Sequence, residues 1–198
     1  MRVRNHVNPF TVRQRFNRQP YGELFSGFSG CLDVEVGFGR GLFLRHYAQR
    51  HPERSILGVE VRGQMVSILE DRLEHDYPNV CLVHGAGDVC FEDMLFDETV
   101  SRVFVFHPDP WFKKKHHKRR VINSDFLCVL KKKLKSSGKL YVSTDVDVLW
   151  AAMTHDIQVA GFISCDDVFW DVDYHSHWDE FSKKDKRTRF CQTFLVDM

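Results

Sequence analysis

The sequence predicts an α/β protein built on a mainly parallel sheet. Short apolar runs alternate with longer segments whose apolar residues recur at helical spacing, the pattern of repeated βαβ units. A chain of 198 residues, of which 43% are hydrophobic, fits one domain or a domain with a short appended arm. We expect a polar, arginine-bearing arm over residues 1–28 and a single domain over residues 29–198.

The expected elements follow the apolar runs in order. Strands are predicted near 31–36, 55–60, 80–84, 101–107 and 138–144. Between them, helical spacing begins near Leu42, Met65 and Phe126. The remainder predicts a helix near 146–160, a strand near 162–170, a polar loop near 171–187 and a final strand near 189–196.

Positive charge is unevenly distributed along the chain. The formal net charge is only +1, which argues against a wholly basic nucleic-acid coat. Four segments nevertheless hold 20 of the 28 Lys and Arg residues, and they are predicted to form one basic face: residues 2–18, 113–120, 131–135 and 183–189. For the third segment we favour helix termination over a nucleic-acid contact, because its lysines follow a helical pattern and complement a helix carboxyl end.

The composition gives no sign of export, a membrane or a metal. Six cysteines without a CxxC pair predict reduced thiols and a cytoplasmic protein. The chain begins without an apolar leader, and no apolar run approaches the roughly 20 residues that span a bilayer. His175, His177 and Cys165 lack a recognised ligand spacing, so we expect no metal site.

A glycine-rich turn follows the first expected strand. Gly37, Gly39 and Gly41 have GxGxG spacing, which lets the backbone approach a ligand but also fits a plain strand-to-helix turn. Glu35 stands where an acid could meet a positively charged ligand. Glu60, 19 residues beyond Gly41, ends the next strand, where a carboxylate can accept both hydroxyls of a ribose. Together these features predict a nucleoside cofactor.

A rigid acid and a basic run follow the fourth expected strand. Asp109 lies between Pro108 and Pro110, which restrict the backbone around it, and Lys113 to Arg120 can neutralise phosphates. The carboxyl ends of parallel strands are where such sheets bind ligands, so we expect acid and cations beside the active site. Trp111 either stacks on a ligand or packs against the sheet.

These residues resemble the bacterial tRNA (guanine(46)-N(7))-methyltransferases. The resemblance covers nearly the whole chain and is most specific in Pro-Asp-Pro-Trp at 108–111 with the Lys, His and Arg run after it. It implies a Rossmann-like class I methyltransferase fold: a mostly parallel seven-stranded sheet with an antiparallel late strand and helices on both faces. It also implies methyl transfer from S-adenosylmethionine to N7 of the variable-loop guanine of tRNA.

The resemblance assigns roles to residues at matching positions. The donor is expected to contact Glu35, Gly37, Gly39, Gly41, Glu60, Gly85, Ala86 and Asp109, and Asp109 is also the candidate catalytic residue. The tRNA is expected to contact Lys113, Asp145, Thr188, Arg189, Phe190 and Cys191.

Two positions depart from the family pattern. Gly85 replaces the usual Asp or Asn, and backbone groups or Asp88 are the available substitutes for its contact with adenine. Cys191 replaces a common Glu, and a thiol cannot accept guanine N–H bonds as a carboxylate does.

The expected mechanism is alignment rather than proton removal. Guanine N7 has an in-plane lone pair and no proton, so Asp109 is expected to orient the reactants first. Three alternatives stay open: a base N6-adenine methyltransferase, a nicotinamide dehydrogenase and a non-catalytic tRNA-binding member of the family. We expect tRNA as the partner, no obligatory protein partner, no membrane, and a monomer or homodimer.

Overall fold

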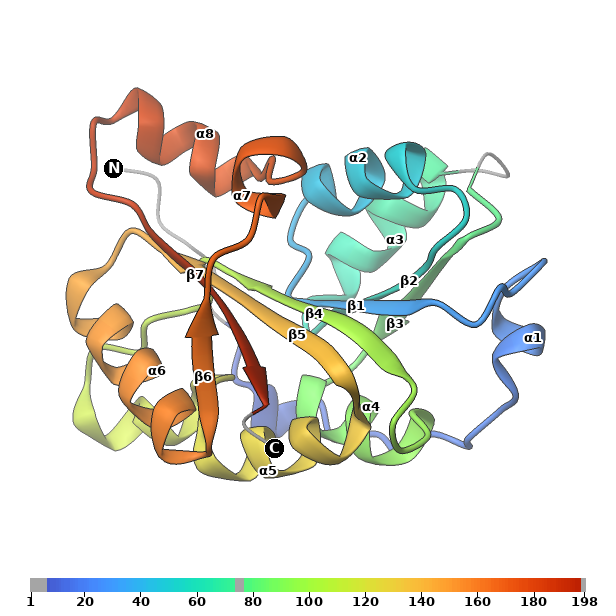
Figure 1. Cartoon of the computed structure of the whole chain (residues 1–198), viewed down its shortest axis with the longest axis horizontal. Helices are drawn as coiled ribbons and strands as arrows, with labels where there is room; N and C mark the ends of the chain where they lie inside the picture. The colour runs from blue at the N-terminus through green and yellow to red at the C-terminus, as the bar shows by residue number, and fades with distance from the viewer. Residues whose placement is uncertain (1–6, 74–76, 197–198) are drawn as a thin grey trace.

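Seven strands form one twisted sheet with helices on both faces in the computed structural model, which describes residues 7–73 and 77–196 (Figure 1). The strand order is β3-β2-β1-β4-β5-β7-β6, and β7 runs antiparallel to both of its neighbours while the other pairs are parallel. The strands are β1 (Leu32–Val36), β2 (Ser55–Glu60), β3 (Val80–His84), β4 (Val100–Phe106), β5 (Leu134–Thr144), β6 (Phe162–Cys165) and β7 (Phe190–Val196). The predicted mostly parallel sheet with an antiparallel late strand is confirmed.

The helices divide between the two faces of the sheet (Figure 1). One face carries α2 (Leu42–Arg50), α3 (Gly63–Leu73), α7 (Phe169–Val172) and α8 (His177–Lys184). The other carries α4 (Gly87–Met94), α5 (Ser124–Lys133) and α6 (Asp147–Val159). Short turns η1 (Pro9–Thr11), α1 (Tyr21–Leu24) and η2 (Lys114–Arg119) lie in the connecting segments.

Alternation along β4 supplies both halves of the core. Phe104 and Phe106 belong to the aromatic cluster under α2 and α7, where Phe104 lies 5.2 Å from the Phe169 ring in a stacked arrangement. Val103 and Val105 belong to the cluster on the opposite face. Because successive strand residues point to opposite faces, one fully buried strand supports both layers and holds the loop after Phe106 in place.

The segment after β6 differs from the prediction. The strand expected near 162–170 ends at Cys165, and Phe169 begins a helix because its ring fills the aromatic cluster. The polar loop expected near 171–187 contains α8, whose first turn is capped by Ser176 Oγ accepting from the backbone N–H of Asp179 at 3.0 Å. Both expectations were wrong. Packing of the Phe169 ring replaces the end of the expected strand by a helix, and the cap at Ser176 lets a polar segment form a helix instead of a loop.

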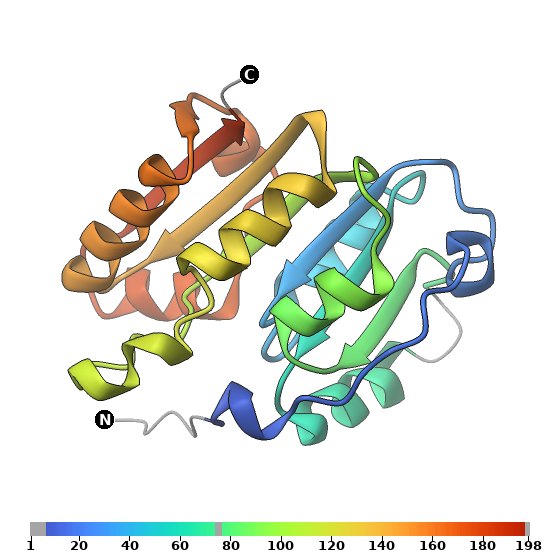
Figure 2. The ribbon, with the colours of Figure 1, turned by 90° about the horizontal axis from the view of Figure 1, so that it is seen from below.

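The arginine-bearing arm lies against α4 and its flanking loops, as Figure 2 shows for the blue segment. Phe16 N–H donates to Asp93 Oδ2 at 3.0 Å, and Arg18 donates to the carbonyls of Glu92 and Asp93 at 2.7 and 3.1 Å. Tyr21 hydroxyl contacts Thr99 Oγ1 at 2.8 Å. Residues 1–6 of the predicted arm lie outside the described residues.

The expectation that all four basic segments form one face is wrong for residues 131–135. Lys135 Nζ donates to the carbonyl of Gly30, just before β1, and Leu134 pairs with Val100 at the start of β4. This group of lysines therefore lies at the amino end of the strands, away from their carboxyl ends, and terminates α5 as favoured. In the described parts of the chain, no helix has the length and apolarity needed to span a membrane.

A buried ion pair joins β1 to the segment before β2. Asp33, fully buried, accepts from Arg54 Nε and Nη2 at 2.5 and 2.6 Å and from Tyr47 hydroxyl at 2.8 Å. Arg102 of β4 donates to the same hydroxyl at 2.7 Å. Three elements are thereby fixed to β1 through one carboxylate.

Asp33→Ala should lower the free energy of unfolding by about 3–5 kcal/mol, because it leaves the Arg54 charge desolvated and unpaired. Urea unfolding measures this loss. The control is Glu92→Ala, whose partner Arg15 lies 3.5 Å away in an exposed pair, and which should change stability by less than about 1 kcal/mol. Equal losses in the two variants would contradict the role of the buried pair.

Candidate active site

A cavity of about 620 Å³ opens at the carboxyl ends of β1, β2 and β4. Its walls come from the glycine turn, the end of β2, the loop after β4, the arm and the start of α8. With Gly85, Gly87 and Asp88 after β3, six segments distant in sequence therefore meet where a parallel sheet presents its ligand-binding edge.

The glycine turn lines this cavity at Gly37 and Gly39, whereas the predicted contact residue Gly41 does not border it. Gly37, Gly39 and Gly41 have φ values of 81°, 61° and 70°. A Cβ on Gly41 would lie 2.3 Å from Leu69 Cδ2, whereas one on Gly37 would enter open space. Glycine is required at Gly41 by close packing of α2 on α3, and at Gly37 it leaves the backbone open to a ligand.

Glu35 is a buried acid whose charge lacks a counterpart. Its side chain borders the cavity with only 4% of the residue exposed, and within residues 7–73 and 77–196 its Oε2 has no hydrogen-bond partner. Burial, followed by repulsion from Glu60, raises the pKa of Glu35 to about 8. A cationic ligand group would relieve this cost, so the acid fits the ammonium of an amino-acid donor such as S-adenosylmethionine.

Glu60 is engaged on both oxygens. It accepts from Gly39 N–H at 2.9 Å and from Arg62 Nε and Nη2 at 2.9 and 2.8 Å. The hydrogen bond to Glu60 is the main reason that the pKa of Arg62 is raised, and Asp109 adds to it. A ribose at Glu60 would have to exchange with Arg62, a cavity residue that the sequence reasoning missed.

The loop after β4 presents Asp109 to the cavity between two residues in left-handed conformations. His107 has φ 46° and Trp111 has φ 45°. Arg120 Nε donates to the Pro110 carbonyl at 2.9 Å, and the Arg119 guanidinium lies 5.0 Å from the centre of the Trp111 ring. The basic run thus folds back on the loop that carries the half-buried Asp109. These contacts restrict the loop in addition to the two prolines that flank Asp109.

The arm fills space beside Gly85. A Cβ on Gly85 would lie 2.9 Å from Phe16 Cζ and 2.7 Å from Cys90 Sγ, so a larger residue at this position would require these side chains to shift. Gly85 borders the cavity, Ala86 is buried at the start of α4, and the nearby Asp88 forms an ion pair with Arg13 of the arm. Both members of that pair line the cavity, so the arm forms part of its wall.

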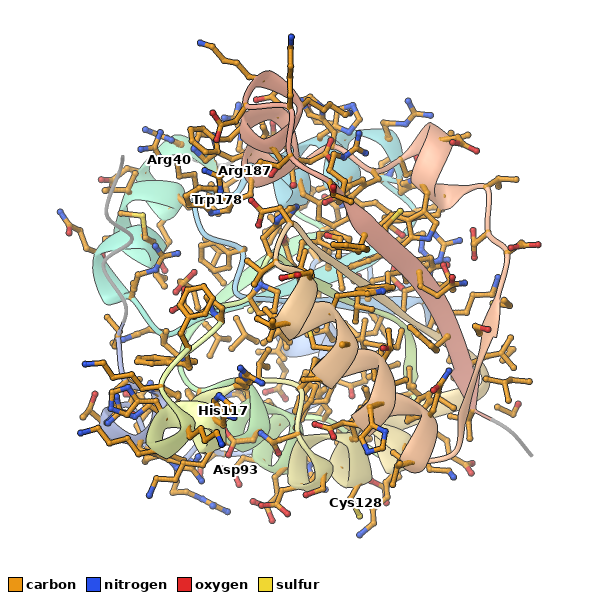
Figure 3. All side chains as sticks on the ribbon, turned by 90° about the vertical axis from the view of Figure 1, so that its left-hand side faces the viewer. Arg40, Asp93, His117, Cys128, Trp178 and Arg187 are labelled. Carbon is orange, nitrogen blue, oxygen red and sulfur yellow. The ribbon has the colours of Figure 1, made fainter. Side chains whose placement is uncertain are left out.

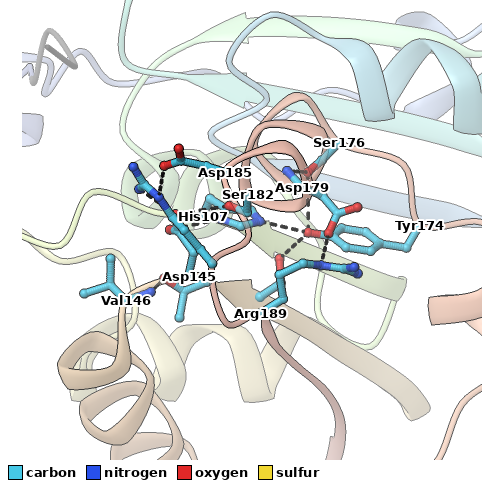
Figure 4. A network of polar contacts seen from close by, with 12 residues as sticks. His107, Asp145, Val146, Tyr174, Ser176, Asp179, Ser182, Asp185 and Arg189 are labelled. Atoms are coloured by element: carbon cyan, nitrogen blue, oxygen red, sulfur yellow. Dashed lines mark hydrogen bonds and ion pairs between the residues drawn. The ribbon is translucent and has the colours of Figure 1, made fainter. Parts of the chain in front are cut away.

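Asp145 lies at the end of β5 in a polar network (Figure 4). Its side chain is 4% exposed and contacts His107, Ser182 and Arg187. The hydrogen bond with His107 is the main cause holding the pKa of Asp145 below its ordinary value. Lys113 is exposed at the start of η2 and is not among the residues that border the cavity.

The late motif lies beside the cavity wall rather than on it. Thr188 is exposed, Arg189 Nε pairs with Asp179 at 2.5 Å, and Phe190 stacks on Trp150 at 5.6 Å. Cys191 borders a separate depression of about 410 Å³. Among the described residues, the structure does not bring these four side chains to the large cavity.

The sequence reasoning also missed the wall contributed by α8 and the arm. Ser176, His177 and Trp178 border the cavity, as do Phe10 and Arg13. Ser176 followed by Asp179 is a helix-capping pattern that could have located α8. Trp178 and Arg40 of the glycine turn, both labelled in Figure 3, border the same cavity.

The chemistry of the cavity suits a ligand that is cationic at one end and carries a nucleoside. The carboxylates of Glu35, Glu60 and Asp109 line it together, with cations of the basic run and the arm at its rim. Within the described ranges, no group of three or more His, Cys, Asp or Glu side chains could hold a metal ion.

Comparison with known proteins gives consistent matches. The family model described as putative methyltransferase matches residues 30–192. A tRNA (guanine-N(7)-)-methyltransferase of Microcystis aeruginosa is 31% identical over 80% of this chain and 78% of its own length. One from Legionella pneumophila is 42% identical over 57% of this chain and half of its own. A crystal structure of an S-adenosylmethionine-dependent methyltransferase from Aquifex aeolicus has the same fold, with a TM-score of 0.59 and 16% identity over 88% of this chain and 92% of that one.

Glu35→Gln should abolish a pH dependence of stability. Because the carboxyl pKa is about 8 in the folded state and near 4.5 when unfolded, the folded protein holds the extra proton between those values, so stability falls as pH rises from about 5 to 8. At pH 8 the variant should be more stable than the parent by on the order of a few kcal/mol, and near pH 4 the difference should vanish.

Urea unfolding at several pH values measures the Glu35 effect. The exposed Glu23 in the first turn of α1 offers a matched control, since Glu23→Gln should leave the pH curve unchanged. Parallel curves for the parent and Glu35→Gln would show that the acid is ordinary in the folded state.

Proposed function

The chain belongs to the family of tRNA (guanine-N(7)-)-methyltransferases, and from this membership we propose that it transfers a methyl group from S-adenosylmethionine to N7 of the variable-loop guanine of tRNA. The observation that carries the proposal is the unpartnered Glu35 oxygen above an open glycine turn, in one cavity with Asp109. The basic run at the rim supports a polyanionic substrate.

Bound in this cavity, S-adenosylmethionine would supply an electrophilic sulfonium methyl. Glu35 would hold the ammonium of the donor, and the turn at Gly37 and Gly39 would let its backbone approach. Glu60 would take the ribose hydroxyls as Arg62 releases it, and the walls formed by Gly85 and Asp88 would border the base.

Asp109 would act on the charge that moves during transfer. The N7 lone pair forms the new N–C bond while the S–C bond breaks and its electron pair stays on sulfur, so positive charge passes to the purine. No proton has to be removed. A fixed carboxylate beside the purine stabilises that charge and orients the base, which makes Asp109 the catalytic residue of the proposal. Lys118 and Arg119, also on the cavity, would neutralise phosphates near the target.

A second candidate is a tRNA-binding protein without turnover. Two observations favour it. Cys191, which replaces an acid common in the family, borders a separate depression, and Glu60 already accepts two hydrogen bonds from Arg62. Calorimetry with S-adenosylmethionine distinguishes the two, since only an enzyme needs to bind the donor. For either candidate we propose tRNA as the partner, action in the cytoplasm, and a monomer or homodimer.

Labelled methyl groups should pass from S-adenosylmethionine to a tRNA transcript and not to one whose variable-loop guanine is replaced by adenine. The reason is that adenine presents a different edge to the residues that position N7. Incorporation of label into each transcript measures the difference. Equal labelling would reject the guanine assignment, and no labelling of either would favour the binding-only candidate.

Asp109→Ala should lower single-turnover methyl transfer by about a hundred-fold while changing donor affinity far less, because the acid acts mainly on the developing charge. Quenched-flow transfer and calorimetry measure the two quantities. Asp125→Ala, at an exposed position in the first turn of α5, is the matched control and should retain the parent rate. Full turnover in Asp109→Ala would remove the proposed role.

A further inference from the structure

His107 is buried at the boundary between the sheet and the cavity. Its side chain is 2% exposed, yet the residue borders the cavity. Its backbone N–H donates to the Ser143 carbonyl at 2.8 Å, which extends the pairing of β4 with β5. With φ of 46°, the residue is held in a left-handed conformation that directs its ring between the two strand ends.

Both ring nitrogens of His107 have polar contacts. Nε2 lies 3.0 Å from Tyr174 hydroxyl, and Nδ1 lies 3.5 Å from Asp145 Oδ1. Tyr174 hydroxyl also lies 2.7 Å from Ser143 Oγ. If Ser143 donates to Tyr174 and Tyr174 donates to Nε2, the remaining N–H of a neutral imidazole is on Nδ1 and faces the acid. This chain of donors orients the ring toward Asp145.

The two oxygens of Asp145 meet different parts of the molecule. Oδ1 faces His107 at the end of β4, which belongs to the sheet. Oδ2 accepts from Ser182 Oγ and from Arg187 Nη1, each at 3.1 Å, which belong to α8 and the segment after it (Figure 4). Arg187 is itself held by Asp185 at 2.7 Å.

We propose that His107 is a positioning residue for Asp145: it holds Oδ1 so that Oδ2 faces the place where the target guanine binds, which Ser182 and Arg187 fill in the free protein. This inference rests on the proposed function and extends it. Asp145 is not among the described residues that border the cavity. The start of α8 does border it, at Ser176, His177 and Trp178, so the inference requires α8 to move when tRNA binds.

The chemistry of guanine matches this exchange. Its N1–H and N2–H are adjacent donors, and they replace one hydroxyl and one guanidinium donor on the same carboxylate oxygen. The exchange replaces the charge-assisted bond from Arg187 by a neutral N–H donor, a loss that contacts of the tRNA elsewhere must offset, and rotation of the carboxylate would add to that loss. His107 prevents that rotation, so its effect falls on tRNA binding.

The test compares His107→Asn with His107→Gln. The amide nitrogen of Asn lies near the position of Nδ1 and retains the bond to Asp145, whereas that of Gln lies near Nε2 and loses it. His107→Asn should keep KM for tRNA within about three-fold of the parent, and His107→Gln should raise it about ten-fold with kcat nearly unchanged. A dissociation constant for tRNA, from fluorescence anisotropy, should show the same ranking.

Tyr174→Phe is a second variant that keeps the ring in the aromatic cluster and removes the hydroxyl that orients His107. It should raise KM for tRNA about three-fold. Thermal unfolding checks that each variant folds, and binding of S-adenosylhomocysteine checks that each keeps the binding site for the methyl donor.

Equal KM values for the Asn and Gln variants, whether both normal or both raised, would show that His107 only fills space and would overturn the inference. A parent protein that binds tRNA with the predicted ranking of variants but transfers no methyl group would contradict the proposed function alone. The two failures are therefore distinguishable.

Discussion

Parallel pairing of β1 with β2 on one side and β4 on the other determines where Glu35, Glu60 and Asp109 lie around the cavity. Glu35, Glu60 and Asp109 are separated by tens of residues, yet their strands end side by side at one edge of the sheet. The alternating side chains of β4 fill both core layers next to β1. A change that displaced β1 would therefore separate all three of these acids, which are expected to bind the methyl donor.

The buried acids of this protein differ in how their charge is compensated. Asp33 has two bonds from Arg54, Glu60 has Arg62, and Asp145 has His107 and Arg187. Glu35 is the exception within the described residues, because one oxygen has no partner and burial raises its pKa. An uncompensated buried charge is expensive, and its position above the glycine turn distinguishes a ligand site from a structural ion pair.

The arm forms the cavity wall beside Gly85. Phe16 lies so close to this glycine that a Cβ would meet its ring at 2.9 Å. Docking of the arm also brings Arg13 to Asp88 on the cavity wall. The absence of a side chain at Gly85 and the packing of the arm therefore go together, because the arm occupies the space beside this glycine and forms part of the cavity wall.

The sequence by itself determined the mostly parallel α/β class, the approximate positions of the first five strands, the glycine turn, the acids at strand ends and the proline-restricted Asp109, whereas the order of the strands came only from the structure. These depend on local periodicity, on backbone restrictions of Gly and Pro, and on the rule that parallel strands end at one edge. Only the tertiary structure showed that Arg62 donates hydrogen bonds to Glu60 and that Ser182 of α8 donates one to Asp145. It also showed that Cys191 borders a separate depression. Such contacts join residues far apart in sequence or depend on the side chains packed around them, so no local pattern encodes them.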